Sequence, residues 1–192
     1  MIIVNFKRYV SGQEAVSLAT LCKKYGAIAC PQLIDLVACV ETGAECWTQK
    51  YEPTAEGNTG TLLNHSDYRV DTQTLEKTLL EIENLTTCVC CATVEEGMKI
   101  DELRPDFLAF ESPELIGNKE KSVSSEKPED IRQLVSSVTC PVLVGAGVHN
   151  AQDVKSALEM GAKGILVATD VVKAKDPEKE LRELVMAFSN SK

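Results

Sequence analysis

Three side chains of different chemistry stand directly after separate apolar runs of the sequence. Lys7 supplies a cation, His65 an imidazole and Glu111 a carboxylate. A carboxylate can accept a proton, an imidazole can donate a hydrogen bond to a carbonyl oxygen, and a cation stabilises negative charge that develops there. The trio therefore suits a ligand that carries a carbonyl group, provided that the fold brings the three side chains together.

Two segments of small residues also follow apolar runs, namely Gly145-Ala146-Gly147 and Ala168-Thr169. Small residues let backbone N–H groups approach an anion closely, and the N-terminus of a following helix adds partial positive charge. Each feature alone has an ordinary structural explanation: a solvated lysine, a core histidine, a surface glutamate or a tight turn. Their shared position after apolar runs favours one site for a phosphorylated ligand.

The elements that must position these residues alternate between short apolar runs and amphipathic helices. Eight such runs read as strands, at residues 2–6, 27–30, 45–49, 61–64, 87–91, 106–110, 141–144 and 164–168. Near-continuous apolar strands separated by helices indicate a parallel α/β protein. Doubly wound sheets and barrels both fit this pattern, and eight units favour a TIM (β/α)8 barrel. In such a barrel, the residues that follow the strands meet at one end.

One unit of the predicted barrel is shorter than the others. Residues 50–60 are rich in turn formers, so we expect a loop and no helix between the third and fourth strands. The chain has 192 residues, whereas barrels of this class usually need about 250. We therefore expect a single domain, residues 1–192, that forms a truncated barrel, and a second subunit that covers the flank left without a helix.

Composition narrows the function classes. The net charge of −9 disfavours nucleic-acid binding, and no segment is long and apolar enough for a membrane span. The N-terminus lacks the charge order of a signal peptide, which predicts a cytoplasmic protein. The eight cysteines lack the C-x₂₋₄-C spacing of metal sites, so we interpret them as free thiols and expect no metal.

Four segments together resemble triosephosphate isomerases, most closely those of the archaeal type. They are NFK at 5–7, LLNHS at 62–66, ESPELIG at 111–117 and GAG at 145–147, and the stretch from 153 to 179 is also similar. The resemblance covers nearly the whole chain in order. It implies the reversible isomerisation of dihydroxyacetone phosphate and D-glyceraldehyde 3-phosphate.

The resemblance also assigns roles. Glu111 corresponds to the base, His65 to a neutral electrophile, and Lys7 to the positive charge, with Asn5 beside it. Residues 112–119 would form a lid that excludes water, and no metal or organic cofactor is implied. The implied phosphate site consists of Gly117, Gly145, Ala146, Gly147, Ala168 and Thr169. Thr59 resembles a threonine that reaches into a neighbouring subunit, which implies a homo-oligomer, a dimer or a tetramer.

The sequence departs from the family pattern at two places. Asn118 and Lys119 replace the usual lid hinge, and Asp170 stands where a small residue is expected near the phosphate. A carboxylate there would weaken phosphate binding unless it points elsewhere. A sugar-phosphate-binding barrel without turnover is therefore an alternative function. A different phosphate-barrel enzyme, such as an isomerase of indole or histidine synthesis, would need other acids at the strand ends.

Overall fold

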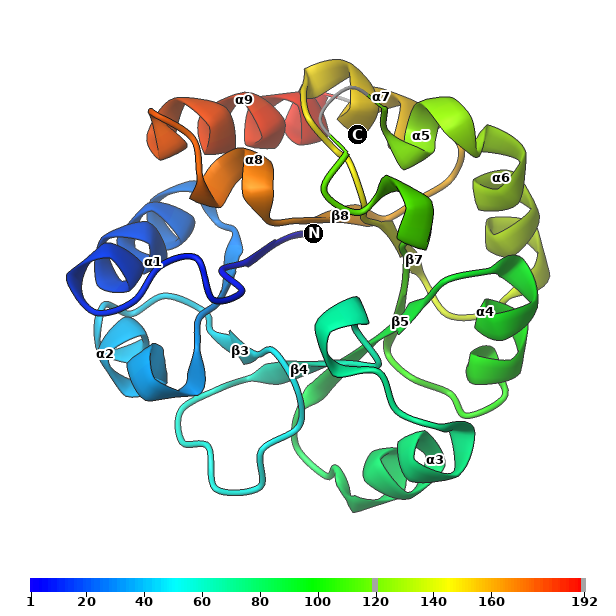
Figure 1. The fold of residues 1–192 in the computed structure, drawn as a ribbon, viewed down its shortest axis with the longest axis horizontal. Helices are drawn as coiled ribbons and strands as arrows, with labels where there is room; N and C mark the ends of the chain where they lie inside the picture. Colours follow the sequence, from blue (N-terminus) through cyan, green and yellow to red (C-terminus); the bar gives the residue numbers. More distant parts are fainter. Residues whose placement is uncertain (119–120, 191–192) are drawn as a thin grey trace.

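The computed structural model describes residues 1–118 and 121–190, whose eight strands form one parallel sheet. The order of the sheet is β2-β1-β8-β7-β6-β5-β4-β3 (Figure 1). The strands are β1 (Ile2–Asn5), β2 (Ile28–Cys30), β3 (Trp47–Thr48), β4 (Gly60–Leu63), β5 (Thr86–Cys91), β6 (Phe107–Phe110), β7 (Val142–Val144) and β8 (Gly164–Val167). A parallel bridge between Ala29 and Cys46 joins the two edges of the sheet. The predicted TIM-type barrel is thus confirmed.

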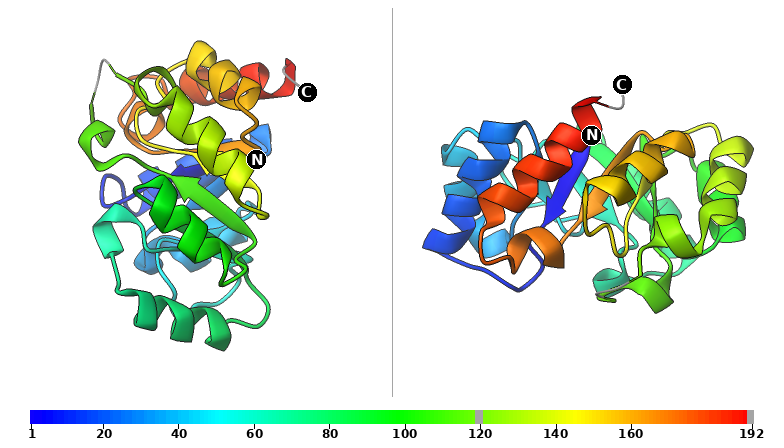
Figure 2. Two further views of the ribbon diagram at one scale, coloured as in Figure 1. Left: turned by 90° about the vertical axis from the view of Figure 1, so that its right-hand side faces the viewer. Right: turned by 90° about the horizontal axis from the view of Figure 1, so that it is seen from above.

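Helices follow seven of the eight strands (Figures 1 and 2). They are α1 (Gln13–Tyr25), α2 (Leu36–Glu41), α3 (Thr72–Glu81), α4 (Val94–Asp101), α5 (Val123–Glu126), α6 (Pro128–Ser137), α7 (Ala151–Glu159), α8 (Thr169–Val172) and α9 (Pro177–Asn190), with 3₁₀ turns η1 (Leu33–Asp35), η2 (Ser66–Tyr68) and η3 (Pro113–Leu115). Side chains of Asp71, Thr93 and Asn150 cap the N-termini of α3, α4 and α7. No helix in residues 1–118 and 121–190 is long and apolar enough to span a membrane.

The polar sequence of residues 112–126 predicts a loop, and this prediction is wrong in part. The segment contains η3 and the four-residue helix α5. Ser122 and Ser125 cap α5 reciprocally, since each side chain accepts a hydrogen bond from the other residue's backbone N–H. The Ser124 hydroxyl also donates to the backbone oxygen of Asp153 at 3.2 Å. Local capping and one tertiary contact therefore hold a turn of helix in a polar sequence.

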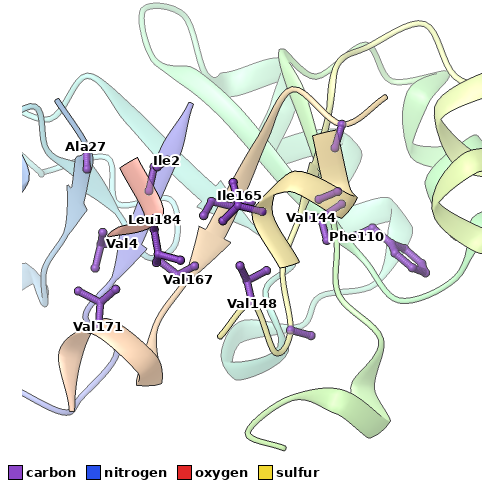
Figure 3. Close-up of a cluster of buried hydrophobic side chains, with 14 of the residues drawn as sticks. Ile2, Val4, Ala27, Phe110, Val144, Val148, Ile165, Val167, Val171 and Leu184 are labelled. Carbon is purple, nitrogen blue, oxygen red and sulfur yellow. The ribbon is translucent and has the colours of Figure 1, made fainter. Parts of the chain in front are cut away.

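Alternation along the strands separates an inner apolar layer from an outer one. Ile3 of β1 and Ala109 of β6 belong to the inner layer, which fills the barrel. Figure 3 shows part of the outer layer, where Val4 and Val167 of the strands lie near Leu184 of α9. Continuing the alternation by two residues turns the side chains after Ile3 and Ala109 toward the barrel axis. The pleat therefore directs Asn5 and Glu111 into the mouth of the barrel.

Residues 49–59 link β3 to β4, and all of them are described and contain no helix. The outward-facing side chains of this flank are nevertheless buried, with Cys46, Thr48, Thr61 and Leu63 at most 5% exposed. In the linker, Tyr51 and Ala55 pack against the outer layer that includes Cys46 and Leu63. These side chains are therefore already buried within one chain, so they do not need the second subunit that was expected to cover this flank.

Candidate active site

One cavity at the C-terminal ends of the strands gathers most of the predicted site residues. Those that line it are Asn5, Lys7, His65, Glu111, Gly117, Ala146, Gly147, Ala168 and Thr169. They come from five strand ends and from the segment after η3, so the barrel unites residues that are up to 164 positions apart in sequence. In the right-hand view of Figure 2, the N-terminus lies at the opposite end of the barrel from the green turn η3.

His65 faces two of the predicted residues through its Nε2 atom. This nitrogen lies 3.6 Å from Glu111 Oε2 and 3.4 Å from Asn5 Nδ2. On the other side of the ring, Nδ1 accepts a hydrogen bond of 3.1 Å from the backbone N–H of Asp67. A ring nitrogen that accepts a hydrogen bond carries no proton, so the single proton of the neutral ring is on Nε2. The ring is thereby oriented to donate into the cavity.

The Asn5 side chain is also oriented by a backbone group. Its Oδ1 accepts a hydrogen bond of 2.9 Å from the backbone N–H of Lys7, so its Nδ2 faces the ring of His65. Because both facing nitrogens carry protons, the separation of 3.4 Å is a contact between two donors and not a hydrogen bond. Asn5 and His65 therefore present two donors to the same point, which suits an oxygen atom of a ligand.

Lys7 adopts a backbone conformation that is rare for a residue with a side chain. Its φ angle is +50°, in the left-handed region. The Gln49 side chain donates to its carbonyl oxygen at 3.0 Å, which helps to hold this conformation. The ammonium group of Lys7 lies 3.1 Å from the Asp67 carboxylate, and the lysine side chain is only 12% exposed. The strained backbone thus directs a nearly buried cation toward the cavity.

Glu111 is buried, and its Oε2 has no hydrogen-bond partner among the described residues. A buried carboxylate oxygen without a partner is costly, so such atoms usually have a functional reason. Behind it, burial and then the charge of Glu111 raise the pKa of the Cys90 thiol well above its usual value. Cys90 therefore stays a neutral thiol that packs behind the carboxylate and does not act as a nucleophile.

Gly145 does not line the cavity, in contrast to the expectation that it contacts phosphate. A Cβ atom at this position would lie 2.8 Å from Cγ and 3.0 Å from Oε1 of Glu111. These distances are too short for van der Waals contact. The glycine therefore makes room for the carboxylate.

Replacing Gly145 with Ala is expected to displace the Glu111 side chain and to lower kcat by about 10²-fold, the cost of a misplacement of about 1 Å. The backbone at this position is not left-handed, so the fold should tolerate the methyl group. Steady-state kinetics and thermal unfolding measure the two effects. An unchanged kcat would contradict the packing role of Gly145.

The small-residue turns beside the cavity have backbone conformations that favour small residues. Ala146 and Gly147 have φ angles of +62° and +77°, and Thr169 begins the short helix α8. A Cβ atom on Gly147 would lie 2.5 Å from the backbone oxygen of Lys121, so only glycine fits there. Gly117, with φ of +74°, belongs to the lid segment 112–118. Lys119 of the predicted lid lies outside the described residues.

Several residues at the cavity were not predicted from the sequence. Tyr9, Ile116 and Val148 also line it, and each is a close neighbour of a predicted residue. Asp170 lines the cavity too, but its Oδ1 lies 2.9 Å from Nδ1 of His149. Asp170 therefore lies near the expected phosphate site, and its carboxylate is engaged by His149.

Thr59 does not lie near this cavity. Its backbone N–H donates to the Cys46 oxygen at 2.9 Å, and its own oxygen accepts from Thr86 at 3.0 Å. These bonds place it immediately before β4, at the N-terminal end of the barrel. The expectation that Thr59 reaches into a neighbouring active site is therefore not supported.

In the part of the chain that the structure describes, no three His, Cys, Asp or Glu side chains are placed to hold a metal.

Comparison with known proteins identifies the family. A triosephosphate isomerase of Thermoplasma volcanium is 34% identical over 96% of this chain and 98% of its own length. One of Methanothermus fervidus is 33% identical over 96% of this chain and 97% of its own. The chain belongs to the triosephosphate isomerase family. The alignments extend over 210 and 216 positions, more than the 192 residues present here, so these isomerases contain segments that this chain lacks.

Other similarities are more general. A family model for the thiazole biosynthesis protein ThiG matches residues 116–191, which include β7 and β8 but less than half of this isomerase chain. A solved thiamine phosphate pyrophosphorylase of Pyrococcus furiosus has a TM-score of 0.72 at 17% identity, over 99% of this chain and 96% of its own. A mandelate oxidase has a TM-score of 0.72 at 15% identity, over 98% and 71%. At these identities, only the barrel fold is shared.

Proposed function

We propose that the protein interconverts dihydroxyacetone phosphate and D-glyceraldehyde 3-phosphate, the isomerisation that serves glycolysis and gluconeogenesis. The proposal is supported by membership of the family and by one feature of the cavity. That feature is the partnerless Oε2 of Glu111, which lies 3.6 Å from the proton-bearing Nε2 of His65. A base and a hydrogen-bond donor at this separation can act on a carbon atom and on the oxygen bonded to it.

Each group has a step in the proposed reaction. Glu111 removes a proton from the carbon next to the carbonyl, and the electron pair moves toward the carbonyl oxygen. The N–H groups of His65 and Asn5 donate to that oxygen, and Lys7 stabilises the negative charge of the enediolate. Glu111 then returns the proton to the former carbonyl carbon, while His65 gives its Nε2 proton to the former carbonyl oxygen and takes up the hydroxyl proton of the neighbouring oxygen. The reaction moves one proton between carbons and one between oxygens and transfers no net electrons, so it requires no organic cofactor.

The phosphate group of the substrate would lie at the other end of the cavity. Ala146, Gly147, Ala168 and Thr169 line the cavity, together with Gly117 of the lid segment, and we place the phosphate beside their backbone. Backbone N–H groups at turns and at helix N-termini bind anions without a bulky side chain. A lid that closes on the phosphate would also exclude water and strengthen the base. We assign these residues to substrate binding, and Gly145 to the support of Glu111.

Turnover of D-glyceraldehyde 3-phosphate tests the proposed function. The wild-type protein is expected to form dihydroxyacetone phosphate, and the product can be measured with a coupled reductase that oxidises NADH. The alternative of a barrel that binds sugar phosphates without catalysis predicts binding of the triose phosphate, by calorimetry, with no product above the uncatalysed rate. That outcome would refute the isomerase proposal for this chain.

We also propose that the protein forms a homo-oligomer in the cytoplasm. The support is an exposed apolar patch formed by Leu33, Ile34 and Val37, whose exposed fractions are 47, 86 and 55%. The patch lies on η1 and α2, and exposed apolar patches often mark interfaces. The molar mass in solution decides the number of subunits.

A further inference from the structure

His149 lies two residues after Gly147 and has a hydrogen-bond acceptor at each ring nitrogen. Nδ1 is 2.9 Å from the carboxylate of Asp170, and Nε2 is 3.3 Å from the backbone oxygen of Lys121. A neutral imidazole has one N–H group and can donate to only one of these acceptors. Both contacts become hydrogen bonds only when the ring is protonated. The geometry therefore favours the imidazolium form.

The two contacts join separate parts of the site. Lys121 follows the lid, and its backbone N–H donates to the Asn118 side chain at 3.0 Å. The next residues rest on the turn after β7, since the N–H of Val123 donates to the Ala146 oxygen at 3.1 Å. Asp170 belongs to the first turn of α8, at the phosphate end of the cavity. His149 thus links the segment that follows the lid to α8.

The charges around His149 explain why this link matters for an anion. Asp170 lines the cavity, and an uncompensated carboxylate there would repel a phosphate dianion. The other groups that face His149 are Asp153 of α7, which accepts from its backbone N–H at 3.0 Å, and the Lys121 oxygen, which carries no net charge. The ammonium group of Lys121 pairs with Glu126 at 3.0 Å and so is engaged elsewhere. The imidazole of His149 is therefore the group that can compensate the negative charge of Asp170.

We propose that His149 is a positioning residue. As an imidazolium, it cancels the charge of Asp170 and joins Lys121, which follows the lid, to α8. The inference rests on the proposed function only in taking the bound anion to be a phosphate. Desolvation lowers the pKa of His149, but the hydrogen bond and charge of Asp170 raise it, with a net increase above 6.5. The link is present below this raised pKa and is lost as the pH rises through it.

The test measures binding of inorganic phosphate and needs no turnover. His149→Gln keeps a hydrogen-bonding side chain without charge, and it is expected to weaken phosphate binding by about five- to tenfold. The double variant His149→Gln with Asp170→Asn should return to within about twofold of wild type, because no charge is left to compensate. As a matched control, Glu159→Gln neutralises an exposed carboxylate at the end of α7 that does not line the cavity, and it should leave binding unchanged.

Nitrogen-detected NMR of the imidazole ring gives the second readout. In wild type, both ring nitrogens of His149 should carry protons at a pH well below 6.5, and the pH midpoint of its titration should fall in Asp170→Asn. Phosphate binding that is unaffected by His149→Gln, or that is not restored in the double variant, would overturn the proposal. Both readouts remain measurable if the protein proves not to be an isomerase, so failure of the proposed function is distinguishable from failure of this inference.

Discussion

Replacing Glu111 with Gln is expected to lower kcat for triose phosphate isomerisation by about a thousandfold or more. General-base catalysis contributes about 10²–10⁴ to a rate, and a buried base gains further strength from desolvation. Gln has nearly the shape of Glu, so it fits the space that Gly145 leaves open. Since the variant removes only the charge and the basic oxygen, its loss of activity would show that Glu111 takes part in the proton transfer.

The same substitution should not unfold the protein. Oε2 of Glu111 has no hydrogen-bond partner among the described residues, so the native state carries an uncompensated buried carboxylate. Neutralising it relieves a desolvation cost, and we expect an unchanged or higher Tm. Glu129→Gln is the matched control, because this side chain on α6 is 84% exposed and should leave both kcat and Tm unchanged. Equal rates in wild type and Glu111→Gln would refute the assignment of the base.

Sequence patterns predicted the architecture because the strongest signals in this chain are local. Apolar runs mark the strands, amphipathic segments mark the helices, and turn formers mark the linker between β3 and β4. The barrel then follows from eight repeated units. Helix α5 was missed because its stability depends on the Ser122–Ser125 cap and on a tertiary contact, neither of which has an apolar period.

Only part of the candidate site could be predicted from the sequence. Residues that directly follow strands, such as Lys7 and Glu111, were found because a barrel brings all strand ends together. His149 was not, because its importance arises only when residues 121, 149 and 170 meet in space. Thr59 was placed near an active site by resemblance alone. It directly precedes β4, and the residue before a strand of a parallel barrel lies at the N-terminal end, opposite the cavity.

Replacing Lys7 with Met should lower kcat/KM by about a thousandfold, with effects on both constants. Among the described residues that line the cavity, Lys7 is the only lysine or arginine, whereas Glu111 and Asp170 are acidic. Without its charge, a phosphorylated substrate meets the Glu111 carboxylate with no lysine of the cavity to offset it, so KM should rise. The enediolate gains negative charge beyond that of the substrate, so kcat should fall as well.

Ionic strength separates this electrostatic role from a structural one. Because Lys7 attracts an anion, the wild-type KM should increase with salt, and the dependence should be weaker in Lys7→Met. Lys24→Met is the matched control, since that lysine side chain is 57% exposed on α1 and pairs with Glu178 away from the cavity. If Lys7→Met lost activity but kept the full salt dependence, the loss would come from the altered backbone at φ of +50° and not from the missing charge. If Lys7→Met instead loses activity, has a KM that depends less on salt than that of wild type, and keeps an unchanged Tm, then the lysine acts as a cation on the anionic substrate.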